Sequence, residues 1–219
     1  MSGGRFEAVV FDMDGVLVDG EPLHFRAVNE LLAPFGKSLS VEEYRPFMGT
    51  KAGWRQMVET LGLPLSPDEY RDRYNAIILR LYREESRPLP GARELVGALR
   101  RAGMPLGLAS SSAKEWVETC LDAIGLAEAF DVVVTGSDVE HGKPDPEIYL
   151  RTAARLGVEP RRCLVFEDAP AGVEAAVRAG MTVWAVRTPY TEGLELPGAA
   201  RVVGSLEEVP VEEIVGVAA

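Results

Sequence analysis

The chain has 219 residues, of which 47% are hydrophobic, and it carries a formal net charge of −11 and two cysteines. This length suffices for one large core, or for a core and a small accessory domain. The negative charge argues against a nucleic-acid backbone as a partner, because its phosphates would be repelled. We expect Cys120 and Cys163 to be small buried residues rather than a disulfide or metal ligands. The first apolar run is too short to span a membrane, which predicts a soluble, cytoplasmic protein.

A buried strand is predicted over residues 6–11, where a short valine-rich run ends at Phe11. Asp12 and Asp14 follow, and Gly15 lets the chain turn away. Residues two apart at a strand end point to the same side, so both carboxylates can face one small volume. They repel each other unless one is protonated or a hard cation such as magnesium lies between them. An isolated pair of this kind is equally typical of a strand end that caps a turn, so the rest of the chain must decide.

An all-helical insert follows, since no strand pattern occurs between roughly residues 20 and 86. Helices are predicted to begin near residues 23, 40, 54 and 66, and the last ends near residue 85. Ser40 with Glu43, and Ser66 with Glu69, have the spacing of a capping box.

From residue 90 onward, strands alternate with helices. The predicted strands cover 105–109, 132–135, 163–166, 182–186 and 201–203, and the helices cover 92–102, 114–124, 145–156 and 172–179. This alternation predicts an α/β fold with a doubly wound parallel sheet that is covered by helices on both faces. The predicted domains are residues 1–18 with 87–219 as the α/β core, and residues 19–86 as the helical insert.

Polar side chains stand at the predicted strand ends, where ligands of such sheets bind. They are Asp12, Asp14, Ser110 with Ser111 and Ser112, Lys143, and Glu167 with Asp168. Carboxylates suit magnesium, and a phosphate needs donors and a cation, which Ser110 and Lys143 supply. A carboxylate close to that phosphate can attack phosphorus, and a second carboxyl can protonate the leaving alcohol and later deprotonate water.

Four motifs together resemble those of the haloacid dehalogenase (HAD) superfamily. They are Asp-Met-Asp-Gly-Val (12–16), Ser110 after an apolar strand, Gly-Lys-Pro-Asp-Pro (142–146) and Glu-Asp-Ala-Pro-Ala-Gly-Val-Glu-Ala-Ala (167–176). Their order and spacing cover the whole chain, which is most similar to the phosphatases and β-phosphoglucomutases that act on small phosphorylated metabolites, often sugar phosphates. The resemblance implies a Rossmann-like core in which residues 19–86 form a helical cap, a type compatible with a monomer.

Carried over by position, the resemblance implies that Asp12 is the nucleophile and Asp14 the general acid and base. Lys143 would neutralise the nucleophile and the phosphate, which explains how an acidic protein can accept an anion. Ser110, with Ser111 beside it, would bind the transferring phosphoryl group. The magnesium ligands would be Asp12, the backbone carbonyl of Asp14, and Asp168, with Glu167 beside the ion.

Several residues keep open interpretations. His24 either contacts the substrate or is a satisfied structural residue, and Lys51 is a candidate to reach the leaving group. Ser112 is expected to cap the helix that begins near Lys114. His141 is expected to be a plain loop residue. The chain departs from the family pattern at Gly20 and Ala169, where relatives usually have a small hydroxyl residue and a serine.

The leading hypothesis is a magnesium-dependent phosphatase acting on a small phosphorylated metabolite, without a nucleic-acid or membrane partner. Asp14 favours phosphoryl transfer over dehalogenation, because a halide leaving group needs no proton. A phosphomutase is the alternative, since His24 and the two residues after it resemble the start of a mutase cap. The basic cap residues of a mutase have no convincing match, which favours the phosphatase. A non-catalytic binding module on the same fold is the third hypothesis.

Overall fold

The computed structural model describes residues 6–45 and 53–216. The chain separates into two compact units, one formed by Met1–Asp19 with Arg87–Ala219 and the other by Gly20–Ser86. We call the first the α/β core and the second the helical insert. Within the described residues, no helix is both long enough and apolar enough to cross a lipid bilayer.

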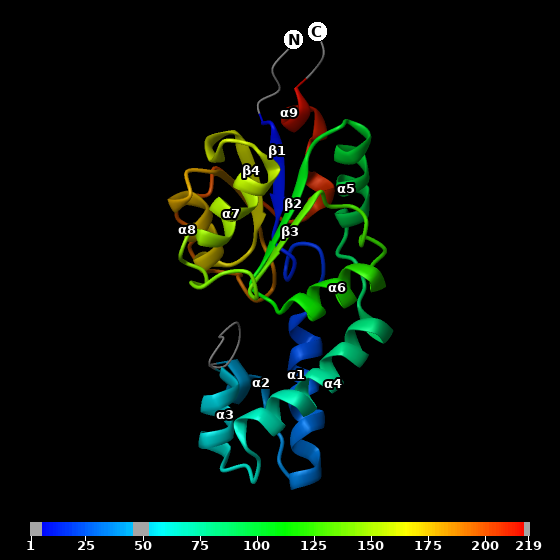
Figure 1. Ribbon diagram of the computed structural model, residues 1–219, viewed down its shortest axis with the longest axis vertical. Helices are drawn as coiled ribbons and strands as arrows, with labels where there is room; N and C mark the ends of the chain where they lie inside the picture. Colours follow the sequence, from blue (N-terminus) through cyan, green and yellow to red (C-terminus); the bar gives the residue numbers. More distant parts are fainter. Residues whose placement is uncertain (1–5, 46–52, 217–219) are drawn as a thin grey trace. The chain divides into compact units, whose positions relative to one another are not determined.

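The α/β core is built on a parallel sheet, as the alternation of strands and helices predicts. Its described strands are β1 (Ala8–Phe11), β2 (Leu106–Ser110), β3 (Val132–Thr135), β4 (Cys163–Glu167), β5 (Thr182–Val186) and β6 (Arg201–Val203). They are ordered β3-β2-β1-β4-β5-β6 (Figure 1), and every pair is parallel. The chain moves outward from β1 to β3 and then returns to the other side of β1. The order therefore reverses between β1 and β4, where ligands of such sheets bind.

The central strands are continuous apolar runs because helices cover them on both faces. All residues of β1, β2 and β4 are buried, and the two free cysteines are buried as predicted. Phe11 pairs with Leu108 on one side and with Phe166 on the other, where the two rings stack at 5.0 Å. This register brings the carboxyl ends of β1, β2 and β4 to one edge of the sheet.

Helices cover both faces of the sheet. The described helices of the core are α5 (Ala92–Arg101), α6 (Lys114–Ala123), α7 (Glu147–Leu156), α8 (Pro170–Arg178) and a short α9 (Val211–Val215). The first four were predicted and α9 was not. Helix α7 packs against β1, β2 and β3, and α8 against β4 and β5. Figure 1 shows α5 on the side of the sheet opposite to α7 and α8.

The helical insert contains α1 (Glu21–Leu32), α2 (Val41–Tyr44), α3 (Gly53–Leu61) and α4 (Pro67–Glu85) among the described residues. Both predicted capping boxes are present, at the starts of α2 and α4. Helix α1 packs along α4, and α3 also contacts α4. The side chains enclosed by these helices are Val28, Leu31, Leu32, Leu39, Tyr44, Met57, Val58, Leu63 and Tyr70.

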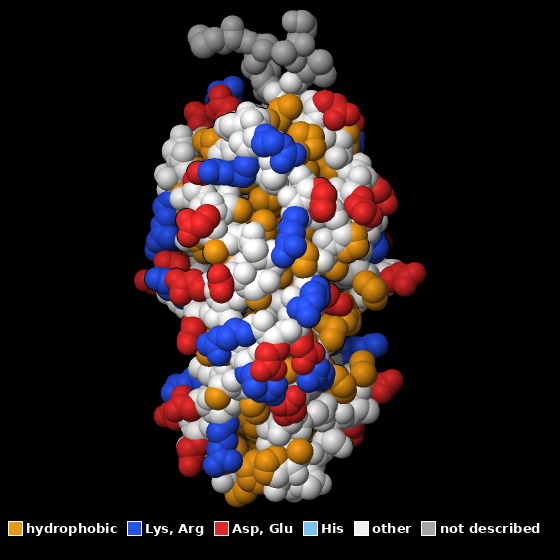
Figure 2. Space-filling view, turned by 90° about the vertical axis from the view of Figure 1, so that its right-hand side faces the viewer, with side chains coloured by type: hydrophobic (Ala, Val, Ile, Leu, Met, Phe, Trp, Pro, Cys, Tyr) orange, Lys and Arg blue, Asp and Glu red, His pale blue; other side chains and the backbone are white. Residues whose placement is uncertain are grey.

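Charged side chains of both signs are interspersed on the face shown in Figure 2. Among the described residues of the whole chain, some ion pairs lie within one helix, as that of Arg151 with Glu147 does at 2.9 Å. Others join two helices, as Arg26 does with Glu85 and Arg80 with Glu30. The net charge of −11 is therefore not gathered into one acidic patch on this face.

Candidate active site

Lys143 forms ion pairs with two buried carboxylates at the carboxyl edge of the sheet. Its Nζ lies 2.5 Å from Asp12 Oδ1 and 2.7 Å from Glu167 Oε1, and it donates to the carbonyl of Ala109 at 3.1 Å. Asp12 follows β1, Glu167 ends β4 and Ala109 belongs to β2, so three strands present oxygens to one ammonium group. The side chains of Lys143, Asp12 and Glu167 are 8%, 10% and 2% exposed. These three contacts match the three donors of the ammonium group and fix it beside Asp12.

Glu167 is held by donors at both of its carboxylate oxygens. Besides Lys143, Oε1 accepts a hydrogen bond from the hydroxyl of Tyr149 at 3.0 Å, and Oε2 accepts one from the amide of Ala169 at 2.9 Å. The ring of Tyr149 also faces the ammonium group, with Nζ 5.0 Å from its centroid. Tyr149 was not predicted as a site residue, because its place on the buried face of α7 indicates a core side chain rather than a partner of Glu167. Glu167 is thus firmly fixed as the anchor of Lys143.

Asp14 is fixed at only one of its carboxyl oxygens. Ser112 Oγ donates to Asp14 Oδ2 at 3.1 Å, whereas Oδ1 is buried and has no hydrogen-bond partner among the described residues.

The prediction that Ser112 caps the next helix is wrong. Ala113 stands at the N-cap of α6 without a side-chain bond, and Ser137 Oγ accepts the amide of Lys114 instead.

Acidic groups outnumber the cation in this region. Burial raises the pKa of Asp12 to about 7, although Lys143 opposes the rise. Burial likewise raises the pKa of Asp14 to about 6. It raises that of Asp168 to about 9, with the nearby charge of Glu167 adding to the effect. Burial works against the charge of Lys143, yet its carboxylate neighbours raise the pKa of this ammonium well above the ordinary value.

The donor set fits a hard divalent cation. A Cβ on Gly15 would lie 2.1 Å from Asp168 Oδ2, and the φ of Gly15 is +79°, so glycine alone permits this close approach. The carboxylate of Asp168 is thereby held beside the turn that carries Asp12 and Asp14. The neighbouring carboxylates of Asp12 and Asp168 are ligands of the kind that magnesium prefers, and a cation between them would offset the cost of their buried negative charges.

Ser110 and Ser111 differ in their surroundings. Ser110 is the last residue of β2 and is buried, and its Oγ accepts the amide of Ser112 at 3.1 Å. Ser111 is exposed in the turn that follows. Because β2 lies beside β1, Ser110 stands at the same edge of the sheet as Asp12.

His24 belongs to the helical insert and is engaged there by tyrosines. Its Nδ1 lies 2.5 Å from the hydroxyl of Tyr74, and its Nε2 lies 2.9 Å from that of Tyr82. Both tyrosines are on α4, so this cluster joins α1 to α4. Of the two readings of His24, these contacts fit the structural one. Lys51, the other substrate-binding candidate in the insert, lies outside the described residues.

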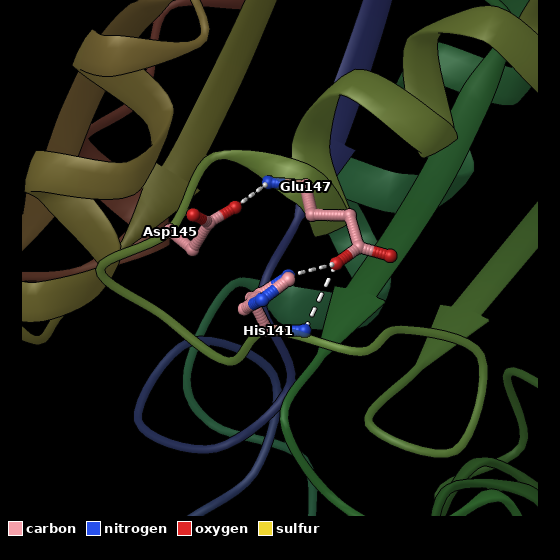
Figure 3. Close-up of side chains that lie close together, drawn as sticks. All are labelled: His141, Asp145 and Glu147. Carbon is pink, nitrogen blue, oxygen red and sulfur yellow. Dashed lines mark hydrogen bonds and ion pairs between the residues drawn. The ribbon is translucent and has the colours of Figure 1, made fainter.

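A second cluster of His141, Asp145 and Glu147 lies in the loop that carries Lys143 (Figure 3). Glu147 accepts the amide of His141 at 2.9 Å, and Asp145 Oδ1 accepts the amide of Glu147 at 2.9 Å. Arg151 also donates to Glu147. The two carboxylates thus accept backbone amides of the loop and of the first turn of α7. With these hydrogen bonds in place, α7 begins at Glu147, two residues later than predicted.

The sequence matches the haloacid dehalogenase-like hydrolase family over residues 6–180. It is 36% identical over 214 residues to the "Phosphorylated carbohydrates phosphatase" of Thermotoga maritima, covering 96% of this chain and 97% of that protein.

Solved structures resemble the whole fold. A mutant of CbbY from Rhodobacter sphaeroides, in complex with xylulose-(1,5)-bisphosphate, superposes with a TM-score of 0.84 at 32% identity, covering 93% of this chain and 96% of the other. The β-phosphoglucomutase of Clostridium difficile superposes with a TM-score of 0.77 at 26% identity, covering 95% of each chain. Phosphatases and a phosphomutase are therefore both among the proteins similar to this one.

Proposed function

Because the chain belongs to the haloacid dehalogenase-like hydrolases, we propose that it is a magnesium-dependent phosphatase of a small phosphate monoester, in particular a sugar phosphate. The observation that carries this proposal is the shielded ion pair between Lys143 and Asp12, with Asp14 two residues further on. A carboxylate beside a fixed cation can receive a phosphoryl group, because the cation offsets the added negative charge. The names of the phosphatase relative and of the sugar bisphosphate bound to CbbY support a phosphorylated sugar as the substrate.

The proposed reaction has two steps that use the same two acids. In the first, a carboxylate oxygen of Asp12 attacks phosphorus, and the bond from phosphorus to the ester oxygen breaks as that oxygen takes a proton from Asp14. The alcohol leaves and an aspartyl-phosphate remains. In the second, water attacks the same phosphorus while Asp14 removes its proton, and the bond between phosphorus and the Asp12 oxygen breaks. Inorganic phosphate leaves, and both residues return to their starting states.

The other site residues would bind magnesium or the phosphoryl group. Asp12, Asp168 and the backbone carbonyl of Asp14 would hold magnesium, with Glu167 beside it as the anchor of Lys143. When bound, the ion supplies positive charge that lets a phosphate approach clustered carboxylates. Ser110, with Ser111 next to it, would donate to the phosphoryl oxygens. We assign the selection of the leaving group to the helical insert as a cap.

Substitution of Asp12 by Asn tests the proposed nucleophile. With magnesium and a panel of sugar phosphates, we expect the wild-type protein to release inorganic phosphate and Asp12→Asn to lose at least about a thousandfold in rate, since no carboxylate can attack. Asp122→Asn on the exposed face of α6 is the matched control and should retain full activity. Unchanged phosphate release by Asp12→Asn would refute the assignment.

A phosphomutase is the second candidate, because a β-phosphoglucomutase shares the fold over most of its length. The first step would be the same, but the phosphoryl group would return to a sugar rather than to water. The ratio of inorganic phosphate to isomerised sugar phosphate, measured with β-glucose 1-phosphate, separates the two. Magnesium binding without turnover of any ester would favour the non-catalytic module.

A further inference from the structure

The two carboxyl oxygens of Asp14 differ in their hydrogen bonding. Asp14 Oδ2 accepts a hydrogen bond from Ser112 Oγ at 3.1 Å, and Asp14 Oδ1 is buried without a partner among the described residues. We propose that Ser112 is a positioning residue for Asp14, which fixes one carboxyl oxygen so that the other delivers the proton to the leaving group. This inference rests on the proposed role of Asp14 as the general acid.

The backbone of Ser112 is anchored on both sides. Its amide donates to Ser110 Oγ at 3.1 Å, and its carbonyl accepts the amide of Gly136 at 2.9 Å. A Cβ on Gly136 would lie 2.2 Å from the carbonyl oxygen of Ser111, so the turn after β3 packs directly on this segment. Ser110 is itself fixed as the last residue of β2. The Ser112 hydroxyl is thus presented from a rigid support rather than from a free loop.

Ser112 does not cap the helix that follows it, because Ser137 does so instead. A serine just before a helix usually accepts an amide of its first turn, but here Ser137 Oγ accepts the amide of Lys114 at 3.2 Å. The hydroxyl of Ser112 is therefore available as a donor to Asp14, which lies on a distant segment of the chain. Helix capping does not account for its orientation, whereas a role toward Asp14 does.

This hydrogen bond determines which oxygen is left for proton transfer. Because the Ser112 hydroxyl occupies Oδ2, the oxygen left to carry the transferred proton is Oδ1. From Oδ1 it passes to the ester oxygen as the bond between that oxygen and phosphorus breaks and Asp12 bonds to phosphorus. Without Ser112, the carboxyl group can rotate and place the proton on the wrong oxygen. The reaction would then lose the geometry that proton transfer requires.

This role predicts an effect that depends on the leaving group. An alkyl ester needs the proton, whereas 4-nitrophenyl phosphate releases a stabilised anion that needs it far less. For Ser112→Ala we expect kcat/KM to fall about tenfold on the best sugar phosphate, a fraction of the 10²–10⁴ typical of a general acid. On 4-nitrophenyl phosphate we expect a change below about twofold. The parameter kcat/KM reports steps only up to departure of the alcohol, so hydrolysis of the aspartyl-phosphate does not enter.

Two further variants complete the experiment. Ser112→Thr keeps the hydroxyl and should restore most of the activity on the sugar phosphate. Ser137→Ala removes the amide partner of α6 and should leave the ratio of the two kcat/KM values unchanged. This ratio is measured on a single preparation, so partial unfolding of a variant cancels. A change in the ratio for Ser112→Ala alone supports the inference.

Equal losses on both esters, or no loss on either, would overturn the inference while leaving the phosphatase proposal intact. If the wild-type protein releases phosphate from neither ester, the proposed function fails and the role of Ser112 fails with it.

Discussion

The hydroxyl of Tyr149 contacts the buried ion pair between Glu167 and Lys143. It donates to Glu167 Oε1 at 3.0 Å, the oxygen that also pairs with Lys143. Tyr149→Phe removes one oxygen atom and leaves the buried ring in place. We expect the free energy of unfolding to fall by about 1.5–3 kcal/mol, the usual range for a hydrogen bond to a charged group. Urea denaturation monitored by circular dichroism measures this difference.

Tyr70 provides a matched control for that measurement. It is equally buried, but its hydroxyl lies 3.1 Å from the sulfur of Met57, a weak and neutral acceptor. Tyr70→Phe deletes the same atom and should cost less than Tyr149→Phe. A cost for Tyr149→Phe no larger than that of the control would show that the Glu167 bond adds no stability.

Sequence patterns predict which residues approach the site better than they predict side-chain partners. Asp12, Lys143 and Glu167 could be brought together because parallel strands end at a common edge of a sheet. Ser112 and Tyr149 could not be placed in this way. A serine before a helix and a tyrosine on a buried helical face each have a common structural use, and only the fold shows which carboxylates they reach.

At the level of elements, α1 and α4 are joined by a histidine that burial keeps neutral. Burial lowers the pKa of His24 to about 4 from its ordinary value of 6.5, and both ring nitrogens face tyrosine hydroxyls of α4. The unfolded chain therefore takes up a proton near pH 6.5 that the folded insert takes up only near pH 4. The stability that neutral His24 contributes is fully present above pH 6.5 and is lost between pH 6.5 and 4, by up to about 1.4 kcal/mol per pH unit.

Urea denaturation at pH 7.5, 6 and 5 tests this loss. His24→Gln lacks the titrating ring, so the wild type should lose unfolding free energy relative to His24→Gln as the pH falls across this window. His141 is the other histidine of the chain and is exposed, so His141→Gln should retain the wild-type dependence. If His24→Gln loses stability between pH 6.5 and 5 as steeply as the wild type, His24 is not the group responsible.

Some boundaries of helices and strands can be predicted from the sequence, and others cannot. The capping boxes of α2 and α4 were predictable, because serine and glutamate three residues apart satisfy each other's backbone amides. Strand β1 begins at Ala8 rather than at residue 6, although Phe6 is buried. Helix α9 was missed because only five residues form it, too few for a helical period to be recognised.

For the whole molecule, the decisive feature is an order reversal in a parallel sheet. Strands β1 and β4 are neighbours although most of the chain lies between them, and their ends carry Asp12 and Glu167 with Asp168. The alternation of strands and helices predicts a doubly wound parallel sheet, and the structure supplies the order in which β1 and β4 are neighbours. It also means that the candidate metal ligands are assembled only in the folded core, so a bound ion must stabilise the folded state.

Magnesium should therefore raise the thermal unfolding midpoint of the core even without substrate. At a concentration of 100 times its dissociation constant, a ligand specific for the folded state adds about 2.7 kcal/mol. Asp168→Asn removes a ligand charge and should lose most of this rise, whereas Asp122→Asn on the exposed face of α6 should keep it. Differential scanning calorimetry with stepwise magnesium, followed by excess EDTA, measures the shift and its reversal. An equal shift for Asp168→Asn and the wild type would place the ion elsewhere, because a site at the ends of β1 and β4 cannot lose this carboxylate without losing affinity.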